Sequence, residues 1–185
     1  LDESARKASA RDLGPIAATG SSAGTTVAGS LRACRLATPK PIQVFATGGI
    51  GGVHRGWQSR PDVSGDLRAL ATEPVAVIAA GAKIILDIPA TREALDTNMI
   101  PVLGWECDNF PRFTSRGSSD QPLERRLDDL ACLAELCRIH WDGLKREEGI
   151  LLLNEISQDD ALDGDTVEDI VTRACHSANE LGIKG

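Results

Sequence analysis

The sequence predicts an α/β fold in which three layers, α/β/α, are built around a largely parallel central sheet. Short apolar runs typical of buried strands alternate with longer segments whose apolar residues recur every three to four positions. Strands that alternate with helices in this way favour a parallel sheet with helices on both faces. The predicted strands are Ile42–Phe45, Val75–Ala80, Val102–Trp105 and Gly149–Asn154. The first of these is expected to be buried on both faces.

Helices are predicted between and around these strands. Those with a clear period or boundary are Ser9–Ala18, Thr25–Leu36, a helix that starts near Ser64 and carries Leu67 and Leu70, Thr91–Thr97, Asp128–Trp141 and Thr166–Leu181. Gly20–Gly24 is expected to be a flexible entry to the second helix. Glu106–Pro122 is predicted to be a long irregular loop, and such loops in compact domains are more often functional than idle.

The inward faces of the last two helices are also predicted from their spacing. In the predicted helix Asp128–Trp141, one amphipathic face comprises Leu130, Leu133, Cys137 and Trp141. The final helix is expected to bury Val167, Ile170, Val171, Ala174 and Leu181.

Composition excludes several classes of protein. The 185 residues suit one domain, residues 1–185, with a sizeable core. A net charge of −7 argues against a sequence-independent nucleic-acid binder and against a basic membrane-surface protein. No apolar run approaches the ~20 residues that span a bilayer. The five cysteines include no CxxC pair, so we expect free thiols in a reducing compartment.

A glycine-rich loop follows the first predicted strand. Gly48, Gly49, Gly51 and Gly52 lie within five positions and are followed by His54 and Arg55. Glycine lets backbone amides approach a ligand closely, and open α/β sheets bind ligands where such loops leave the strands. The loop matches neither GxGxxG nor a Walker loop. It is either a ligand-binding loop or a tight turn without a ligand.

Lys83 is the strongest candidate for covalent chemistry. It follows a predicted buried strand and precedes Ile84, Ile85 and Leu86, where desolvation would lower the pKa of its amine. A neutral amine can attack a sugar aldehyde to form a Schiff base. The alternative is an ordinary lysine at the surface end of a strand.

Other polar residues allow two interpretations. Asp62 and Asp66 could present carboxylates to Mg²⁺ or Mn²⁺, or they could be a helix cap and a first-turn acid. His54 and Arg55 could act in acid–base chemistry or bind phosphate. The helix that begins at Thr25 or Thr26 could bind an anion at its start or simply be capped.

The longer motifs of the sequence are KASARDL, GTTVAG, VFATGGIGGVHRG, PDVSGDL, VAVIAAGAKIILDIP, PVLGW and LLLNEIS. Together they resemble the pseudouridine-5′-phosphate glycosidases, the indigoidine synthase A-like family. The resemblance implies reversible cleavage of the carbon–carbon glycosidic bond of pseudouridine 5′-phosphate to uracil and ribose 5-phosphate. It also implies a cytoplasmic Mn²⁺-dependent homotrimer, and some relatives are fused to a sugar kinase.

The resemblance assigns roles by position. Lys83 matches the covalent lysine, which attacks the ring-opened ribose at its anomeric carbon, and Asp62 matches the metal ligand. The implied substrate contacts are Lys7, Val27, Ser64, Gly65 and Asp66.

The chain also departs from the family pattern. The segment that carries the family's proton-donating glutamate is absent before Lys7, and a stretch that follows Gly185 in the family is absent as well. Residues 1–185 are therefore expected to form a partial glycosidase-like domain whose sheet is incomplete at one edge. Two functions remain open: a glycosidase, or a catalytically inactive fragment or descendant that binds ribose phosphate or assembles with full-length subunits.

Overall fold

The computed structural model describes residues 5–183, and it confirms the α/β fold class. Five parallel strands form one sheet in the order β3-β4-β7-β5-β6. Their bounds are β3 Val44–Thr47, β4 Ala76–Ala79, β5 Val102–Trp105, β6 Arg126–Leu127 and β7 Ile150–Asn154. Because the strands are parallel, their carboxyl ends lie at one edge, where open α/β sheets bind ligands.

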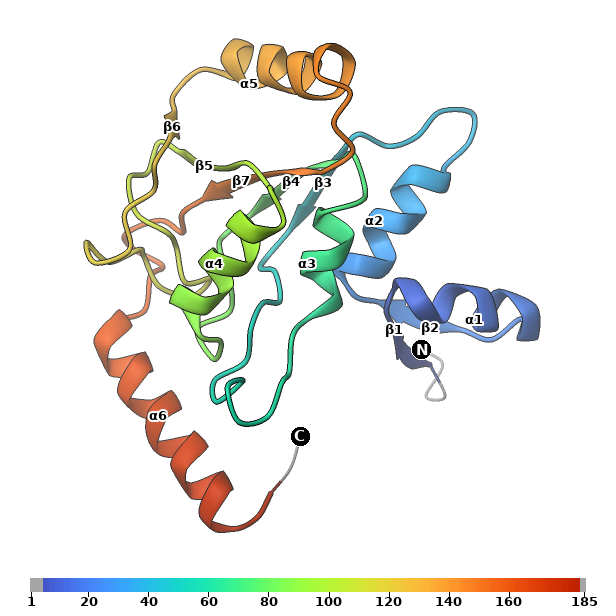
Figure 1. Ribbon diagram of the computed structural model, residues 1–185. Coiled ribbons are helices and arrows are strands. Elements are labelled where there is room, and N and C mark those ends of the chain that lie inside the picture. Colours follow the sequence, from blue (N-terminus) through green and yellow to red (C-terminus); the bar gives the residue numbers. More distant parts are fainter. Residues whose placement is uncertain (1–4, 184–185) are drawn as a thin grey trace.

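Helices lie on both faces of this sheet (Figure 1). One face is covered by α2 (Val27–Leu36), α3 (Gly65–Leu70) and α4 (Ile88–Thr97). The strand residues Val77, Leu151 and Leu153 are fully buried on this side. The other face is covered by α5 (Leu130–Cys137) and a π-helix (Arg138–Gly143), which pack against Leu103, Ile150 and Leu152. The predicted three layers are therefore confirmed.

The prediction that the first strand is buried on both faces is wrong. Ile42 is 50% exposed and Val44 is 62% exposed. The reason is that β3 is the edge strand of the sheet, and α5 packs over β5 and β7 rather than over β3. Within residues 5–183, β3 has a hydrogen-bonded neighbour, β4, on one side only.

The N-terminal segment forms a small unit of its own. β1 (Arg6–Ala8) pairs in parallel with β2 (Ala23–Thr25). The expectation of a flexible Gly20–Gly24 entry is therefore wrong for its last two residues, which lie in a strand. The first predicted helix starts as a 3-10 turn, Ala10–Asp12, and continues as α1, Leu13–Thr19. As expected, α2 begins after Thr26, whose hydroxyl caps it.

The two C-terminal helices differ from their predicted packing. In the face predicted for α5, Leu133 and Trp141 pack on the sheet, but Leu130 is 65% exposed. α6 (Gly164–Glu180) lies at the side of the molecule, away from the sheet (Figure 1). Because the sheet lies elsewhere, Ile170, Ala174 and Leu181 are exposed, and the prediction that they are buried is wrong.

All five cysteines are free thiols, as the spacing predicts. Among residues 5–183, no helix combines the length and the apolar composition needed to cross a bilayer.

Candidate functional site

The glycine loop and the segment that carries Lys83 meet at the carboxyl ends of β3 and β4. Ile50 and Ala82 form a parallel bridge between the two segments. The amide of Ile50 donates to the carbonyl of Gly81 at 3.0 Å, and the amide of Lys83 donates to the carbonyl of Ile50 at 3.3 Å. These bonds extend the β3–β4 pairing beyond the strands and place Lys83 directly beside the glycine loop.

The glycines of this loop permit close packing. A Cβ on Gly51 would collide with the hydroxyl of Ser64, and a Cβ on Gly52 would collide with the side chain of Thr91. The loop is therefore held against the start of α3 on one side and against α4 on the other. Glycine is required here because other elements approach the backbone closely.

Asp66 joins three of the predicted segments through its buried carboxylate, which is 7% exposed. One oxygen accepts from the amide of Ala28 at 2.9 Å, and the other accepts from the amide of Gly51 at 2.9 Å. The side chain thus links the start of α2, the glycine loop and α3. Sequence reasoning assigned Asp66 to substrate contact or metal binding, but its two oxygens already hold backbone amides.

The start of α2 is a capped helix whose free amides are largely satisfied within the protein. Asp66 accepts from Ala28, and the hydroxyl of Thr26 accepts from Gly29 at 3.4 Å. Of the two interpretations left open by the sequence, this favours the capped helix. Val27, one of the implied substrate contacts, begins this helix and is half-buried.

The segment that contains Lys7 lies against the same region. The carbonyl of Ala8 accepts from the amide of Thr26 at 2.8 Å, and a Cβ on Gly65 would lie 3.2 Å from the hydroxyl of Ser9. Ser64 caps α3 as predicted, with its hydroxyl accepting from the amide of Asp66 at 3.2 Å. The implied substrate segments are therefore neighbours around the start of α3, and Lys7 itself is exposed on β1.

Lys83 is exposed, so the expectation that its apolar neighbours desolvate the amine is wrong. The chain turns at this point, and the following residues alternate in direction: Ile84 and Leu86 are buried, whereas Ile85 is 48% exposed. The side chain of Lys83 therefore lies on the solvent side of the segment, next to the glycine loop.

Asp62 and His54 lie side by side, which sequence reasoning missed. Val53 and Val63 form an antiparallel bridge, and the amide of His54 donates to the carbonyl of Asp62 at 2.9 Å. This pairing places Nδ1 of His54 4.0 Å from a carboxylate oxygen of Asp62. In the sequence, this pairing is indicated by the short segment that leads from the glycine loop back to Ser64, the cap of α3.

Asp62 and His54 are donors suited to a weakly held metal ion. The side chain of Asp62 is 66% exposed and that of His54 is 43% exposed. Within the described part of the chain, no cluster of three or more His, Cys, Asp or Glu side chains is placed to hold a metal. A metal at Asp62 would therefore take most of its ligands from water and substrate.

Arg55 has protein partners, contrary to its possible role as a free phosphate-binding group. Its guanidinium pairs with both carboxylate oxygens of Glu168 and donates to the carbonyl of Ile84 at 2.8 Å. The pairing joins the glycine loop to α6, 113 residues away in the sequence.

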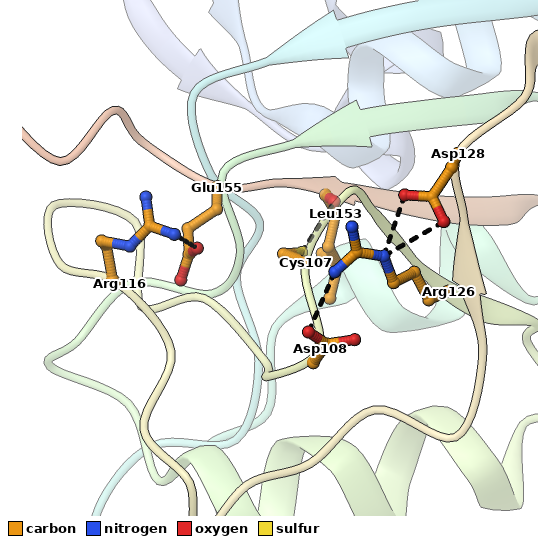
Figure 2. Close-up of polar contacts among 7 residues, drawn as sticks. All are labelled: Cys107, Asp108, Arg116, Arg126, Asp128, Leu153 and Glu155. Carbon is orange, nitrogen blue, oxygen red and sulfur yellow. Dashed lines mark hydrogen bonds and ion pairs between the residues drawn. The ribbon is translucent and has the colours of Figure 1, made fainter.

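The loop over Glu106–Pro122 is irregular, as predicted, but it is tied to the sheet (Figure 2). Glu155, which follows β7, pairs with Arg116 and accepts from the amide of Gly117 at 2.6 Å. The thiol of Cys107 donates to the carbonyl of Leu153 at 3.5 Å, and burial raises its pKa. Arg126 lies between Asp108 and Asp128 and pairs with both (Figure 2).

The same loop brings Phe113 onto the glycine loop, a contact that the sequence did not reveal. Its ring lies 2.8 Å from the Cβ position of Gly48 and 2.9 Å from that of Gly49. Phe113 has a φ of 64°, which is unusual for a bulky residue. Its amide donates to the carbonyl of Ala80 at 2.8 Å, which fixes the loop to the end of β4.

A cavity of about 580 Å³ lies elsewhere, between α4 and the segment 121–125. It is lined by Ile100 and Pro101 at the amino end of β5, whereas Lys83 follows the carboxyl end of β4. This cavity is therefore separate from the residues that the sequence singles out.

Comparison with known proteins places these features in a family. The sequence matches the family described as "Indigoidine synthase A like protein" over residues 1–185. It is 43% identical over 180 residues to the pseudouridine-5′-phosphate glycosidase of Caldanaerobacter subterraneus, and 41% identical over 179 residues to that of Myxococcus xanthus. Each match covers 97% of this chain and 57% of the relative.

Two solved structures share the fold. The crystal structure of the prealnumycin C-glycosynthase AlnA in complex with ribulose 5-phosphate matches with a TM-score of 0.92 and 37% identity, over 100% of this chain and 59% of that chain. An indigoidine synthase A-like protein from Thermotoga maritima matches with a TM-score of 0.84 and 30% identity, over 92% of this chain and 55% of that one.

The chain thus spans a little more than half the length of the curated relatives it matches. The match to the family nevertheless extends over every residue of the chain, and the fold matches the two solved structures closely. The chain belongs to the family of indigoidine synthase A-like proteins.

Proposed function

We propose that this chain carries the lysine and metal parts of a pseudouridine-5′-phosphate glycosidase site. The observation that carries the proposal is the position of Lys83: it follows β4 and lies beside the glycine loop, which Asp66 in turn joins to the start of α2. The relatives named above, at 41–43% identity, support a sugar phosphate bonded to a base as the substrate class. AlnA, solved with ribulose 5-phosphate, supports a five-carbon sugar phosphate.

In the proposed chemistry, the amine of Lys83 adds to the C1 aldehyde of ring-opened ribose 5-phosphate. Loss of water then leaves an imine between the lysine nitrogen and C1. Lys7 would offer an ammonium group to the phosphate, while Val27 and the Ser64–Asp66 segment would enclose the sugar. Because Lys83 is exposed, bound substrate would have to exclude water from the amine during the addition.

We propose that Asp62 is the main protein ligand of Mn²⁺, with His54 beside it. The exposed carboxylate and imidazole suit a divalent cation that keeps several waters. When bound, the metal would supply positive charge next to the substrate. We also propose, from the same family resemblance, that the whole protein is a cytoplasmic homotrimer.

Breaking the bond to uracil also requires a proton on the base. No carboxylate in this sequence matches the family's donor, and Asp66 has both oxygens engaged by backbone amides. A missing general acid typically costs 10²–10⁴-fold in rate. We therefore expect this chain to form the lysine adduct but to release uracil very slowly. The second candidate function, a non-catalytic ribose phosphate binder, is favoured by the exposure of Lys83.

The test is to incubate the protein with ribose 5-phosphate and borohydride and to locate the reduced adduct by mass spectrometry. Borohydride supplies hydride to the imine and converts it to a stable secondary amine. The expected adduct is on Lys83, and it should disappear in Lys83→Arg. An adduct on Lys7 or Lys145 would remove Lys83 from its role. Binding of ribose 5-phosphate with no adduct at all would support the non-catalytic function.

Uracil release from pseudouridine 5′-phosphate is measured in parallel. Slow release by this chain, restored when the segment that precedes Lys7 in the relatives is added, is the expected result. Brisk release by the chain alone would show that a group already present supplies the proton, and His54→Gln would then test His54 as that group.

A further inference from the structure

One guanidinium connects three segments that are far apart in the sequence. The Nη1 and Nη2 atoms of Arg55 donate to the two carboxylate oxygens of Glu168, at 2.5 and 2.8 Å. Nη2 also donates to the carbonyl of Ile84 at 2.8 Å. Arg55 follows His54 in the glycine-loop segment, Ile84 follows Lys83, and Glu168 lies in the first turns of α6.

The pairing is geometrically specific. A guanidinium that meets a carboxylate with two parallel hydrogen bonds is held in one plane and one orientation, which an ammonium group could not achieve. The side chain of Arg55 is 26% exposed and that of Glu168 is 41% exposed, so solvent screens the pair only in part. The carboxylate raises the pKa of Arg55, and the guanidinium lowers the pKa of Glu168. Both groups therefore stay charged over a wide pH range.

Few other contacts attach α6 to the body of the protein. A cavity of about 550 Å³ lies beside the pair, lined by Leu86, Asp87 and Asp165 among others. Within residues 5–183, apart from the bond between the amide of Thr166 and the adjacent Asp163 side chain, the side-chain hydrogen bonds that cross from α6 to the rest of the chain all involve Arg55. Further along the helix, Ile170 is 50% exposed. The position of α6 thus depends strongly on Arg55.

The carbonyl of Ile84 depends on Arg55 in turn. Among the described residues, the guanidinium is its hydrogen-bond donor, and the residue is only 6% exposed. A buried carbonyl without a donor is unfavourable, so loss of Arg55 would favour movement of this backbone. Lys83 is the preceding residue, and its own amide bond to Ile50 is long, at 3.3 Å. The lysine backbone is therefore held from both sides by these two hydrogen bonds.

We propose that Arg55 and Glu168 form a clasp through which α6 positions the backbone that carries Lys83. Arg55 is a positioning residue: it acts on the reaction through the Ile84 carbonyl and does not touch the substrate. The consequence for catalysis rests on the proposed function of Lys83, whereas the mechanical coupling between α6 and residues 83–86 does not.

The test compares Glu168→Gln with Asp169→Asn. Both changes replace a carboxylate by the amide of the same size on the same helix. Asp169 is a matched control because it pairs with Arg173 on the exposed side, at 2.9 Å. Arg55→Lys is the third variant, since it keeps the charge but loses the two-pronged geometry.

The first measurement is hydrogen exchange without ligand. In Glu168→Gln and Arg55→Lys, we expect faster exchange both in residues 164–172 and in residues 83–88, with the rest of the sheet unchanged. Asp169→Asn should match the wild type in both segments. Faster exchange in α6 with unchanged exchange in residues 83–88 would overturn the clasp, because α6 would then be attached without acting on the lysine segment.

The second measurement is the rate of borohydride trapping as a function of ribose 5-phosphate concentration. Misplacement of a reacting group by a remote change can cost up to about 10²-fold, so we expect a roughly tenfold lower maximal trapping rate in Glu168→Gln. The half-saturating concentration should stay near that of the wild type. A change confined to half-saturation in Arg55→Lys would overturn the positioning role in favour of direct phosphate binding by Arg55. If the wild type is not trapped at Lys83, the proposed function fails, and hydrogen exchange still decides the coupling.

Discussion

Asp62 and Asp66 lie one helical turn apart in the sequence, and their side chains have opposite surroundings. Asp66 is buried and accepts two backbone amides, whereas the side chain of Asp62 is 66% exposed beside His54. A carboxylate that already holds two N–H groups has little capacity left for a cation, while an exposed one keeps its oxygens available. This contrast assigns the metal to Asp62 in our proposal and gives Asp66 the task of joining α2 to the glycine loop.

The metal assignment predicts the result of a single substitution. Asp62→Ala should abolish measurable Mn²⁺ binding, because the remaining donor, His54, cannot hold the ion alone. Binding can be followed by paramagnetic relaxation of water and by calorimetry. Asp96→Ala is a matched control, since Asp96 is an exposed aspartate on α4. Unchanged Mn²⁺ binding in Asp62→Ala would contradict the assignment.

The local contacts of a residue were easier to predict from the sequence than its distant partners or its exposure. The cap of α3 by Ser64 follows from a local hydrogen bond, so the sequence predicts it. The partner of Arg55 is 113 residues away, and no local pattern indicates it. The exposure of Lys83 was missed for a different reason: an apolar run after a strand does not reveal which of its side chains turn outward.

At the scale of elements, the contact between the 106–122 loop and the end of β4 depends on one glycine. Gly81 has a φ of 105°, and a Cβ there would collide with the carbonyl of Pro111. Gly81 and Arg112 form an antiparallel bridge at this point. The bridge also places Phe113 over Gly48 and Gly49. Gly81 is therefore needed for the 106–122 loop to contact the glycine loop.

Gly81→Ala should therefore be strongly destabilising. An alanine at positive φ costs roughly 1–2 kcal/mol, and the collision with backbone adds to this, giving a total of roughly 2–4 kcal/mol. Gly14→Ala is the control, because Gly14 is helical and has no atom within 4 Å of its Cβ position. It should change stability by about 0.5 kcal/mol in the favourable direction. Urea unfolding measures both, and equal effects at the two glycines would contradict the explanation.

The elements themselves were predictable where they are long and apolar. β4, β5 and β7 agree with the predicted strands to within about one residue at each end, because each is a mostly apolar, largely buried run. β1, β2 and β6 were missed since strands of two or three residues carry no period. The π-helix was also missed, and it takes the place of the last turn of the predicted long helix.

At the scale of the whole molecule, the parallel sheet was predictable but its order was not. β7 is last in the sequence and yet lies at the centre, between β4 and β5. Such pairing is decided by contacts between distant segments, which local patterns do not report. The same arrangement leaves β3 at the edge, with Ile42, Val44 and Ala46 exposed.

That edge predicts how the chain behaves in solution. A strand with unpaired backbone groups and apolar side chains promotes association between molecules, and lysine on an edge strand opposes it. We expect this chain to associate non-specifically with rising concentration, and we expect Val44→Lys to reduce the effect. Leu162→Lys is the control, because Leu162 is 55% exposed but lies outside the sheet. It adds the same charge and should leave association nearly unchanged.

Light scattering over a concentration series, combined with calorimetry, separates these outcomes. The edge explanation requires that the scattering mass falls in Val44→Lys far more than in Leu162→Lys, with both variants melting cooperatively. An equal fall in the two variants would show that net charge alone controls association, since each lysine moves the chain from −7 to −6. A wild-type chain that stays a monodisperse, cooperatively melting monomer would contradict the prediction altogether, because β3 would then be protected without a neighbour.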